Sequence, residues 1–166
     1  MRKKAILTKE TIFNIVRDLK EQGKTIGLTY GAFDLFHFSH LDLLRKASEK
    51  CDYLIVGVEC DENVSSYKTY KRPIIEEKAR LGLISELNVV DAAMLMDISF
   101  DHELRQEFVK DCKADFVAIG QKFGAEEQVR EDAFKAGASL IKFQTTQDYI
   151  TTKIIEKIIK LDDEVA

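Results

Sequence analysis

The stretch Tyr30–His40, YGAFDLFHFSH, joins the end of an apolar run to a glycine and two histidines. It ends the apolar run Thr25–Tyr30, which we predict to be a β-strand, and it precedes Leu41–Ala47, whose pattern predicts an amphipathic helix. Two of the chain's three histidines, His37 and His40, lie in it, three residues apart. The stretch is therefore a strand, a glycine-containing turn and a histidine pair near the start of a helix.

Strands and helices alternate along the rest of the chain. Four more apolar runs predict strands: Tyr53–Val58, Val89–Leu95, Asp115–Ile119 and Ser139–Phe143. Segments whose apolar residues repeat at helical spacing predict helices over Thr8–Glu21, His40 to about Lys50, Pro73 to about Leu87, His102–Cys112, Ala125–Ala136 and Thr151–Leu161. The first of these helices is predicted to begin with a capping box at Thr8. This alternation predicts one α/β domain, residues 1–166, with a doubly wound parallel five-stranded sheet, helices on both faces and a Rossmann-like topology.

Composition narrows the class of protein. With 45% hydrophobic and 33% charged residues the chain is typical of a folded globular protein. A net charge of −4 argues against a general nucleic-acid partner, because phosphate backbones attract basic surfaces. The cysteines form no CxxC pair, so we expect reduced thiols in a cytoplasmic protein. No apolar run approaches the roughly 20 residues of a membrane-spanning helix, so no membrane partner is expected.

Three segments that are distant in the sequence are expected to meet at one edge of the sheet. Parallel sheets bind ligands at the carboxyl ends of their strands, near the point where strand order reverses. Tyr30–His40 follows the first predicted strand, Gly120 follows the fourth, and Thr145–Thr152 follows the fifth. We therefore expect a binding site built from these segments.

The opening stretch has the features of a phosphate site. Gly31 lets backbone amides approach a ligand without a Cβ in the way. Ser39 is a predicted N-cap, and a helix N-terminus attracts anions. In a first helical turn His37 and His40 would share one face and could donate hydrogen bonds to phosphate. A bound anion would raise the pKa of both imidazoles and so favour the donor form.

A histidine pair at this spacing has other interpretations. Two histidines three residues apart are often a surface or core pair without a ligand. A zinc site is the second alternative, but no carboxylate or cysteine near His37 and His40 completes one, so we predict no metal ligand in the protein. Because the histidine pair follows a predicted strand and a glycine-containing turn, we favour a phosphate site over these two alternatives.

The sequence resembles the cytidylyltransferase-like nucleotidyltransferases. Gly31–His40 is similar to the family signature G-x-F-D-x-x-H-x-G-H. Three further segments agree with the family in order and spacing. Lys68 corresponds to the family's mobile lysine loop, and Lys71–Ile74 with Arg80 corresponds to its R-P-I segment before an arginine-bearing helix. Tyr149–Ile154 is similar to the family's closing Y-S-T-T-x-I segment. The likeness covers nearly the whole chain.

The resemblance implies a reaction and its partners. A phosphorylated alcohol attacks the α-phosphorus of CTP or ATP, and pyrophosphate leaves. A phosphate monoester is already largely ionised at neutral pH, so the reaction needs no general base. Catalysis then depends on positioning and on neutralising charge. The resemblance also implies Mg²⁺ bound with the nucleoside triphosphate, and a homodimer.

Roles for individual residues follow from the same resemblance. The expected catalytic residues are His37, His40, Lys68 and Arg80. The expected nucleotide-binding residues are Tyr30, Gly31, Ala32, Phe33, His37, His40, Gly120, Thr146, Thr151 and Thr152. The expected acceptor-binding residues are Asp34, Lys68 and Arg80.

Several of these residues have structural alternatives. Asp34 could brace the turn instead of touching a ligand. Arg80 could pair with Glu76 or Glu77 along its helix. The hydroxyls at Thr151 and Thr152 could serve only as an N-cap, which would leave the phosphates to other groups.

The acceptor cannot be carried over from the family. Ser39 stands where the signature has glycine, and Gly120–Gly124 and Thr145 differ from the segments that touch base or acceptor in relatives. Thr29–Gly31 and Thr151–Ile154 resemble glycerol-3-phosphate cytidylyltransferases. Lys71–Ile74 resembles the heptose-1-phosphate adenylyltransferase domain, and the helix that carries Arg80 resembles archaeal flavin adenylyltransferases. The first hypothesis is transfer of CMP from CTP to a glycerol-3-phosphate-like polyol or a sugar phosphate. The alternatives are transfer of AMP from ATP to a heptose-1-phosphate-like sugar or to FMN, and a catalytically impaired nucleotide-binding protein.

Overall fold

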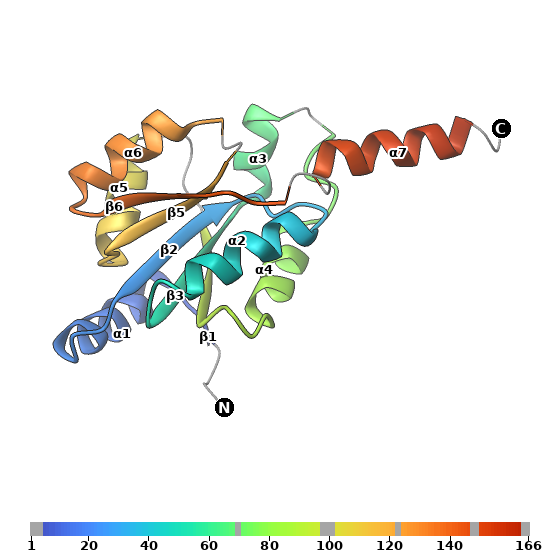
Figure 1. Ribbon diagram of the computed structural model, residues 1–166. Helices are drawn as coiled ribbons and strands as arrows, with labels where there is room; N and C mark the ends of the chain where they lie inside the picture. The colour runs from blue at the N-terminus through green and yellow to red at the C-terminus, as the bar shows by residue number, and fades with distance from the viewer. Residues whose placement is uncertain (1–4, 69–70, 97–101, 122–123, 147–149, 164–166) are drawn as a thin grey trace.

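A parallel six-stranded sheet forms the centre of the molecule (Figure 1). The computed structural model describes residues 5–68, 71–96, 102–121, 124–146 and 150–163. The strands lie in the order β1-β4-β3-β2-β5-β6. Their bounds are β1 Ala5–Ile6, β2 Ile26–Gly31, β3 Tyr53–Glu59, β4 Ala92–Met96, β5 Phe116–Gly120 and β6 Ser139–Phe143. The predicted α/β fold is confirmed: β2 to β6 are the five predicted strands, and the two-residue β1 pairs with β4 at the edge.

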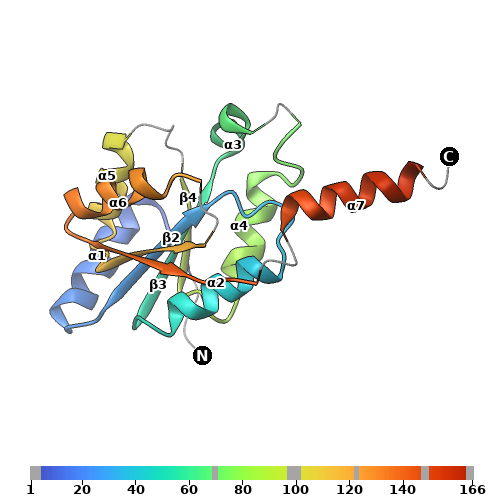
Figure 2. The same ribbon diagram turned by 45° about the horizontal axis from the view of Figure 1, so that its top comes forward.

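Helices cover both faces of the sheet. Their bounds are α1 Lys9–Glu21, α2 Phe38–Ser48, α3 Asp61–Tyr67, α4 Glu77–Ser85, α5 His102–Asp111, α6 Glu126–Lys135 and α7 Thr151–Asp163. Residues of α1, α5 and α6 share one buried cluster, and residues of α2 and α4 share the other. In both views α7 projects away from the sheet (Figures 1 and 2).

The central strands are apolar throughout because both of their faces are buried. On β2, Leu28 belongs to one core cluster; on β3, Ile55 belongs to that cluster, and its neighbours Leu54 and Val56 belong to the other. All four are inaccessible to solvent. Successive side chains point to opposite faces of a strand, so a continuous apolar run is needed to fill both cores.

The order of the strands determines where a ligand binds. From β2 the chain moves outward through β3 to β4, then crosses back to β5 on the other side of β2. Loops that leave β2 and β5 therefore diverge to opposite faces, and a crevice opens at the carboxyl ends of these strands. Residues of Tyr30–His40 lie at this edge together with Gly120 and with Thr145, which follows β6.

Some predicted boundaries were wrong. The α2 helix begins at Phe38, with His37 as its N-cap, so Ser39 is not the N-cap. The β4 strand begins at Ala92 rather than Val89, because the chain turns before it and the Asp91 carboxylate accepts a hydrogen bond from the Leu54 amide at 2.9 Å.

Two other predictions near helix ends had different outcomes. The capping box at Thr8 is confirmed, with Thr11 as its second residue. The helix after Pro73 begins only at Glu77, because the amides of the intervening residues donate to a carboxylate that lies outside the helix. These differences change helix ends and leave the topology intact.

Candidate active site

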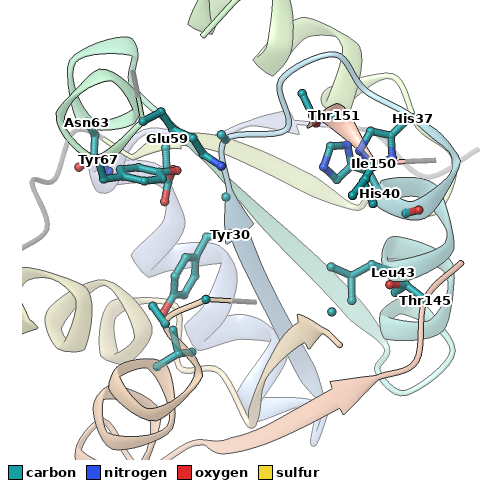
Figure 3. Close-up of a pocket in the computed structure, with 18 of the residues that line it drawn as sticks. Tyr30, His37, His40, Leu43, Glu59, Asn63, Tyr67, Thr145, Ile150 and Thr151 are labelled. Carbon is teal, nitrogen blue, oxygen red and sulfur yellow. The ribbon is translucent and has the colours of Figure 1, made fainter. Parts of the chain in front are cut away.

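A pocket of about 610 Å³ opens at the carboxyl edge of the sheet (Figure 3). Nine residues that the sequence assigned to the site line it: Tyr30, Gly31, Ala32, His37, His40, Lys68, Gly120, Thr151 and Thr152. They come from β2, α2, α3, β5 and α7, so the predicted convergence of distant segments is present. Four other assigned residues do not line it: Phe33, Asp34, Arg80 and Thr146.

The two histidines lie against each other at the start of α2. Their ring centroids are 3.8 Å apart and the ring planes meet at 20°. Phe33 packs against His40 edge to face, at 5.4 Å between centroids. Both Nδ1 atoms are buried, with no hydrogen-bond partner among the described residues. Two imidazoles with unused nitrogen atoms beside a helix N-terminus are suited to bind an anion.

Burial sets the protonation state of this pair. It lowers the pKa of His37, and it lowers the pKa of His40 to about 3, with the neighbouring His37 as the next largest cause. Both rings are therefore neutral at pH 7 in the free protein. A bound phosphate would oppose this shift, since an adjacent negative charge favours the protonated imidazole.

The turn between β2 and α2 depends on left-handed residues other than glycine. Phe33 has a φ of 50° and Leu35 a φ of 46°, whereas Gly31 lies in the strand without a positive φ. Left-handed backbone is uncommon for bulky side chains and persists only where surrounding contacts hold it. The role given to Gly31 in making the turn is thus carried by Phe33 and Leu35.

Asp34 supplies those contacts. Its carboxylate accepts hydrogen bonds from the amides of Ile74 and Ile75, both at 3.0 Å, and from Arg72 Nε at 2.6 Å. Burial by itself would raise the pKa of Asp34, but these donors outweigh it and hold the pKa below its usual value. The backbone carbonyl of Asp34 accepts from the Thr151 hydroxyl at 3.2 Å. This geometry favours the bracing role for Asp34 over contact with an acceptor.

Arg80 joins four segments beneath the pocket. Its Nε donates to the Ile75 carbonyl at 2.8 Å, and its Nη1 donates to the Ala32 carbonyl. Its Nη2 donates to the Glu59 carbonyl at 2.8 Å and to the Asp61 carboxylate at 2.6 Å. The side chain is 1% exposed. Contact with phosphate would require these bonds to break, so in this structure Arg80 positions the site from below.

The charged partner of Arg80 was not the one considered from the sequence. Its ion pair is with Asp61 at the start of α3, rather than with Glu76 or Glu77 on its own segment. Glu77 instead accepts a hydrogen bond from the Asp61 amide at 2.8 Å. These contacts fix α3 against α4, and α3 carries Lys68 at its C-terminal end.

Lys68 is the cation that lines the pocket from α3. Its Nζ lies 5.5 Å from the centroid of the Tyr67 ring. The Tyr67 hydroxyl donates to Glu59 Oε2 at 2.5 Å, so the end of α3 is tied to the end of β3. The long side chain of Lys68 therefore extends from a helix end that is held in place. Such a side chain is suited to bind a phosphate in the pocket.

One face of α2 holds the segment that follows β6. The Ser39 hydroxyl donates to the Thr146 carbonyl, and the Asp42 carboxylate accepts from the Thr146 amide at 3.1 Å. Lys46 Nζ donates to the Gln144 carbonyl at 2.6 Å. These contacts place Thr145 beside Gly120 in the pocket wall.

Sequence reasoning missed part of the pocket lining. Four lining residues, Ser39, Gly124, Thr145 and Ile150, lie in segments that the sequence placed at the site. The missed residues are Leu43, Glu59, Asn63, Tyr67, Met96, Arg105, Ala125 and Val129. Glu59 carried a usable signal, because it is a charged residue at the carboxyl end of a buried strand. The others come from helices and loops whose approach to the pocket depends on the fold.

The described residues contain no group of three or more histidine, cysteine, aspartate or glutamate side chains that could hold a metal ion. In the same part of the chain no helix is long and apolar enough to cross a membrane. Within the segments that the sequence placed at the site, residues 122, 123 and 147–149 lie outside the described ranges.

The chain is similar to several known proteins. It is 35% identical over 149 residues to the bifunctional protein HldE of Nitratiruptor sp.. This alignment covers 90% of this chain and 31% of that protein. It is 31% identical over 154 residues to the bifunctional protein HldE of Caulobacter vibrioides, with 92% and 31% covered. The chain thus spans about a third of the length of these curated relatives.

Solved structures agree with this result. A lipopolysaccharide core biosynthesis protein from Thermoplasma volcanium matches with a TM-score of 0.60 and 30% identity, over 75% of this chain and all of that chain. A pantoate-beta-alanine ligase from Francisella tularensis shares the fold alone, with a TM-score of 0.66 and 14% identity over 87% of this chain and 69% of that chain. The cytidylyltransferase-like family model matches residues 28–157, which contain the histidine pair, the lysine-bearing helix end and the start of α7. The chain therefore belongs to the cytidylyltransferase-like family.

Proposed function

We propose that the protein transfers AMP from ATP to a small sugar phosphate and releases pyrophosphate. The observation that carries the proposal is the stacked pair His37 and His40, which lines the pocket at the N-terminus of α2. Figure 3 shows Thr151, at the start of α7, on the same side of the pocket. Two helix N-termini and two imidazoles can together bind a triphosphate.

The choice of ATP and a sugar differs from the first hypothesis of CTP and a polyol phosphate. The bifunctional HldE relatives and the lipopolysaccharide core protein support the sugar-phosphate alternative. The resemblance of Lys71–Ile74 to a heptose-1-phosphate adenylyltransferase domain agrees with them. The first hypothesis has in its favour the resemblance of Thr29–Gly31 and Thr151–Ile154 to glycerol-3-phosphate cytidylyltransferases.

The proposed reaction is an attack of one phosphate on another. An oxygen of the acceptor's ionised phosphate forms a bond to the α-phosphorus of ATP, and the bond between the α-phosphorus and the bridging oxygen to the β-phosphorus breaks. Negative charge would grow on the leaving pyrophosphate, and we expect His37, His40 and Lys68, which line the pocket, to neutralise it. Because the attacking oxygen is already ionised, no residue has to remove a proton.

In this pocket we expect magnesium to bind together with the nucleotide, as a complex with its phosphates. Mg²⁺ usually keeps several waters and binds through substrate phosphates, with one or two carboxylates at most. The described residues offer no cluster of ligands, so the triphosphate oxygens would supply most of the coordination. The ion would supply charge neutralisation on the phosphates. A homodimer also stays a prediction, which light scattering of the whole chain would test.

Pyrophosphate release tests the proposal directly. The purified protein is assayed with ATP and with CTP, each against mannose 1-phosphate, glycerol 3-phosphate and FMN. We expect release with ATP and the sugar phosphate at a kcat/KM at least about tenfold above every other pair, a difference of about 1.4 kcal/mol. Faster release with CTP and glycerol 3-phosphate would overturn the choice of substrates. No release with any pair, while a thermal shift still reports nucleotide binding, would support a binding protein instead.

A further inference from the structure

The pocket has a second polar end that the proposed reaction does not use. Figure 3 shows Glu59, Asn63 and Tyr67 together on one side, away from His37 and His40. These three residues come from the carboxyl end of β3 and from α3, and all of them line the pocket. The histidine end is suited to anions, so the chemistry of this other end indicates which part of the substrate occupies it.

Glu59 places a carboxylate in this wall. The residue is 8% exposed, and its Oε2 accepts the Tyr67 hydroxyl at 2.5 Å. Within the described residues its Oε1 receives no hydrogen bond. Burial raises the pKa of Glu59, and the hydrogen bond from Tyr67 and the charges of Lys68, Arg80 and Arg105 only partly oppose that shift. A carboxylate oxygen in a pocket wall that has no protein donor can accept a hydrogen bond from a ligand.

Asn63 adds a second acceptor to the same wall. It lies one turn further along, in α3, and is 7% exposed. Its Oδ1 is buried and has no hydrogen-bond partner among the described residues. Buried polar atoms are normally satisfied, so an unsatisfied amide oxygen that lines a pocket indicates a place for a ligand donor.

The two acceptors exclude some ligands and favour others. A phosphate placed against Glu59 would be repelled by its carboxylate, so the phosphates belong at the end with His37 and His40. Lys68, whose Nζ lies 5.5 Å from the Tyr67 ring centroid, is near both ends. Hydroxyl groups, which can donate to both oxygens, satisfy this wall without bringing charge. A site built to bond hydroxyls discriminates strongly against analogues that lack them, because its buried acceptors would then stay unpaired.

We infer that Glu59 and Asn63 form the subsite that recognises the hydroxyl groups of a polyhydroxylated acceptor, and that they determine specificity for a sugar phosphate over a smaller alcohol phosphate. The inference rests on the proposed function and names the substrate class of the same pocket. It assigns specificity to two residues that take no part in the transfer of the nucleotide.

Binding without turnover tests the inference. Titration calorimetry measures mannose 1-phosphate, its monodeoxy analogues and inorganic phosphate, with a non-hydrolysable α,β-methylene ATP analogue present. In the Glu59→Gln and Asn63→Ala variants we expect the Kd for mannose 1-phosphate to rise about 10-fold or more, as expected for a lost hydrogen bond to a buried group. Affinity for inorganic phosphate and for the ATP analogue should stay within about twofold. At least one deoxy analogue should bind the unaltered protein as weakly as mannose 1-phosphate binds the variants.

Glu62 provides the matched control, since it is an exposed glutamate on the same helix. Glu62→Gln should leave all affinities unchanged, and thermal melts of every variant establish that the fold is kept. The inference is overturned if the unaltered protein binds no sugar phosphate, or if either variant weakens the ATP analogue as much as the sugar. Because calorimetry needs no turnover, selective loss of sugar binding in a protein that releases no pyrophosphate would refute the proposed function and leave the inference standing.

Discussion

The hydroxyl of Ser39 donates a hydrogen bond to the backbone carbonyl of Thr146 and so joins the first turn of α2 to the segment after β6. Ser39 is the residue that departs from the glycine of the family signature. Its neighbour one turn along, Asp42, accepts a hydrogen bond from the Thr146 amide at 3.1 Å. The departure from the signature therefore has a structural use, because it helps to hold one wall of the pocket.

Restoring the glycine should weaken this wall without abolishing the reaction. In Ser39→Gly we expect kcat to fall less than about threefold, and the KM for ATP to rise about 2- to 10-fold, the equivalent of one ordinary hydrogen bond. Ser39→Ala should give the same KM change, because it removes the hydroxyl without adding backbone freedom. Steady-state kinetics with ATP as the varied substrate decides the matter. A KM unchanged in both variants would show that the Thr146 contact does not shape the nucleotide site.

The histidine pair should be required for turnover. Replacing His37 or His40 with alanine removes a group placed to neutralise charge, and loss of one such group commonly lowers kcat by about 10²- to 10³-fold. The third histidine, His102, lies outside the pocket lining and bonds to Asp132 at 3.1 Å, so His102→Ala is the control. We expect that control to keep kcat within about twofold. Equal losses in all three variants would contradict the assigned role.

Stability should fall in mild acid because of His40. Its pKa in the folded chain is about 3, below the ordinary value of 6.5, so the unfolded chain binds more protons between these values. The stabilising contribution is complete above about pH 6.5 and is lost as pH falls toward about 3. Between pH 7 and pH 5 the free energy of unfolding should drop about 2 kcal/mol more in the unaltered protein than in His40→Gln. Urea denaturation at the two pH values measures the drop, and identical drops would refute the assignment.

We expect replacement of Arg80 to affect the stability of the fold more directly than it affects ATP binding. Its guanidinium makes its bonds at fixed angles that a lysine ammonium cannot reproduce, and loss of a buried charged partner costs about 3 to 5 kcal/mol. We expect Arg80→Lys to lower the free energy of unfolding by about 3 kcal/mol. Arg130, which is exposed and pairs with Glu126 at 2.8 Å, is the control; Arg130→Lys should cost about 0.5 kcal/mol or less. A stable Arg80→Lys protein that has lost ATP binding would restore the role of Arg80 as a phosphate ligand.

The sequence alone was sufficient to predict those elements whose structure is determined by a local pattern of residues. Thr8 and Thr11 cap α1 as predicted, and the apolar runs of β2 and β3 became central strands because their side chains face two cores. It was insufficient for α3, a seven-residue helix whose one buried hydrophobic residue, Val64, gives no helical period. It also missed the two-residue β1, whose pairing partner lies far along the chain.

The candidate site shows the same division. His37 and His40 could be found because a motif places them at a helix start. The role of Arg80 could not, because its partners Ala32, Glu59 and Ile75 are brought to it only by the fold. Residue type shows that a guanidinium can bind phosphate, but only the surrounding contacts show that its donors are already used.

The most direct test follows the oxygen that links the two substrates. Mannose 1-phosphate carrying heavy oxygen on its phosphate is incubated with ATP, and phosphorus NMR locates the label by its shift. Attack on the α-phosphorus predicts that the labelled oxygen bridges the sugar phosphate and AMP, and that the released pyrophosphate carries no label. Release of ADP, or a product in which the acceptor is joined to the γ-phosphorus, would contradict nucleotidyl transfer in this pocket.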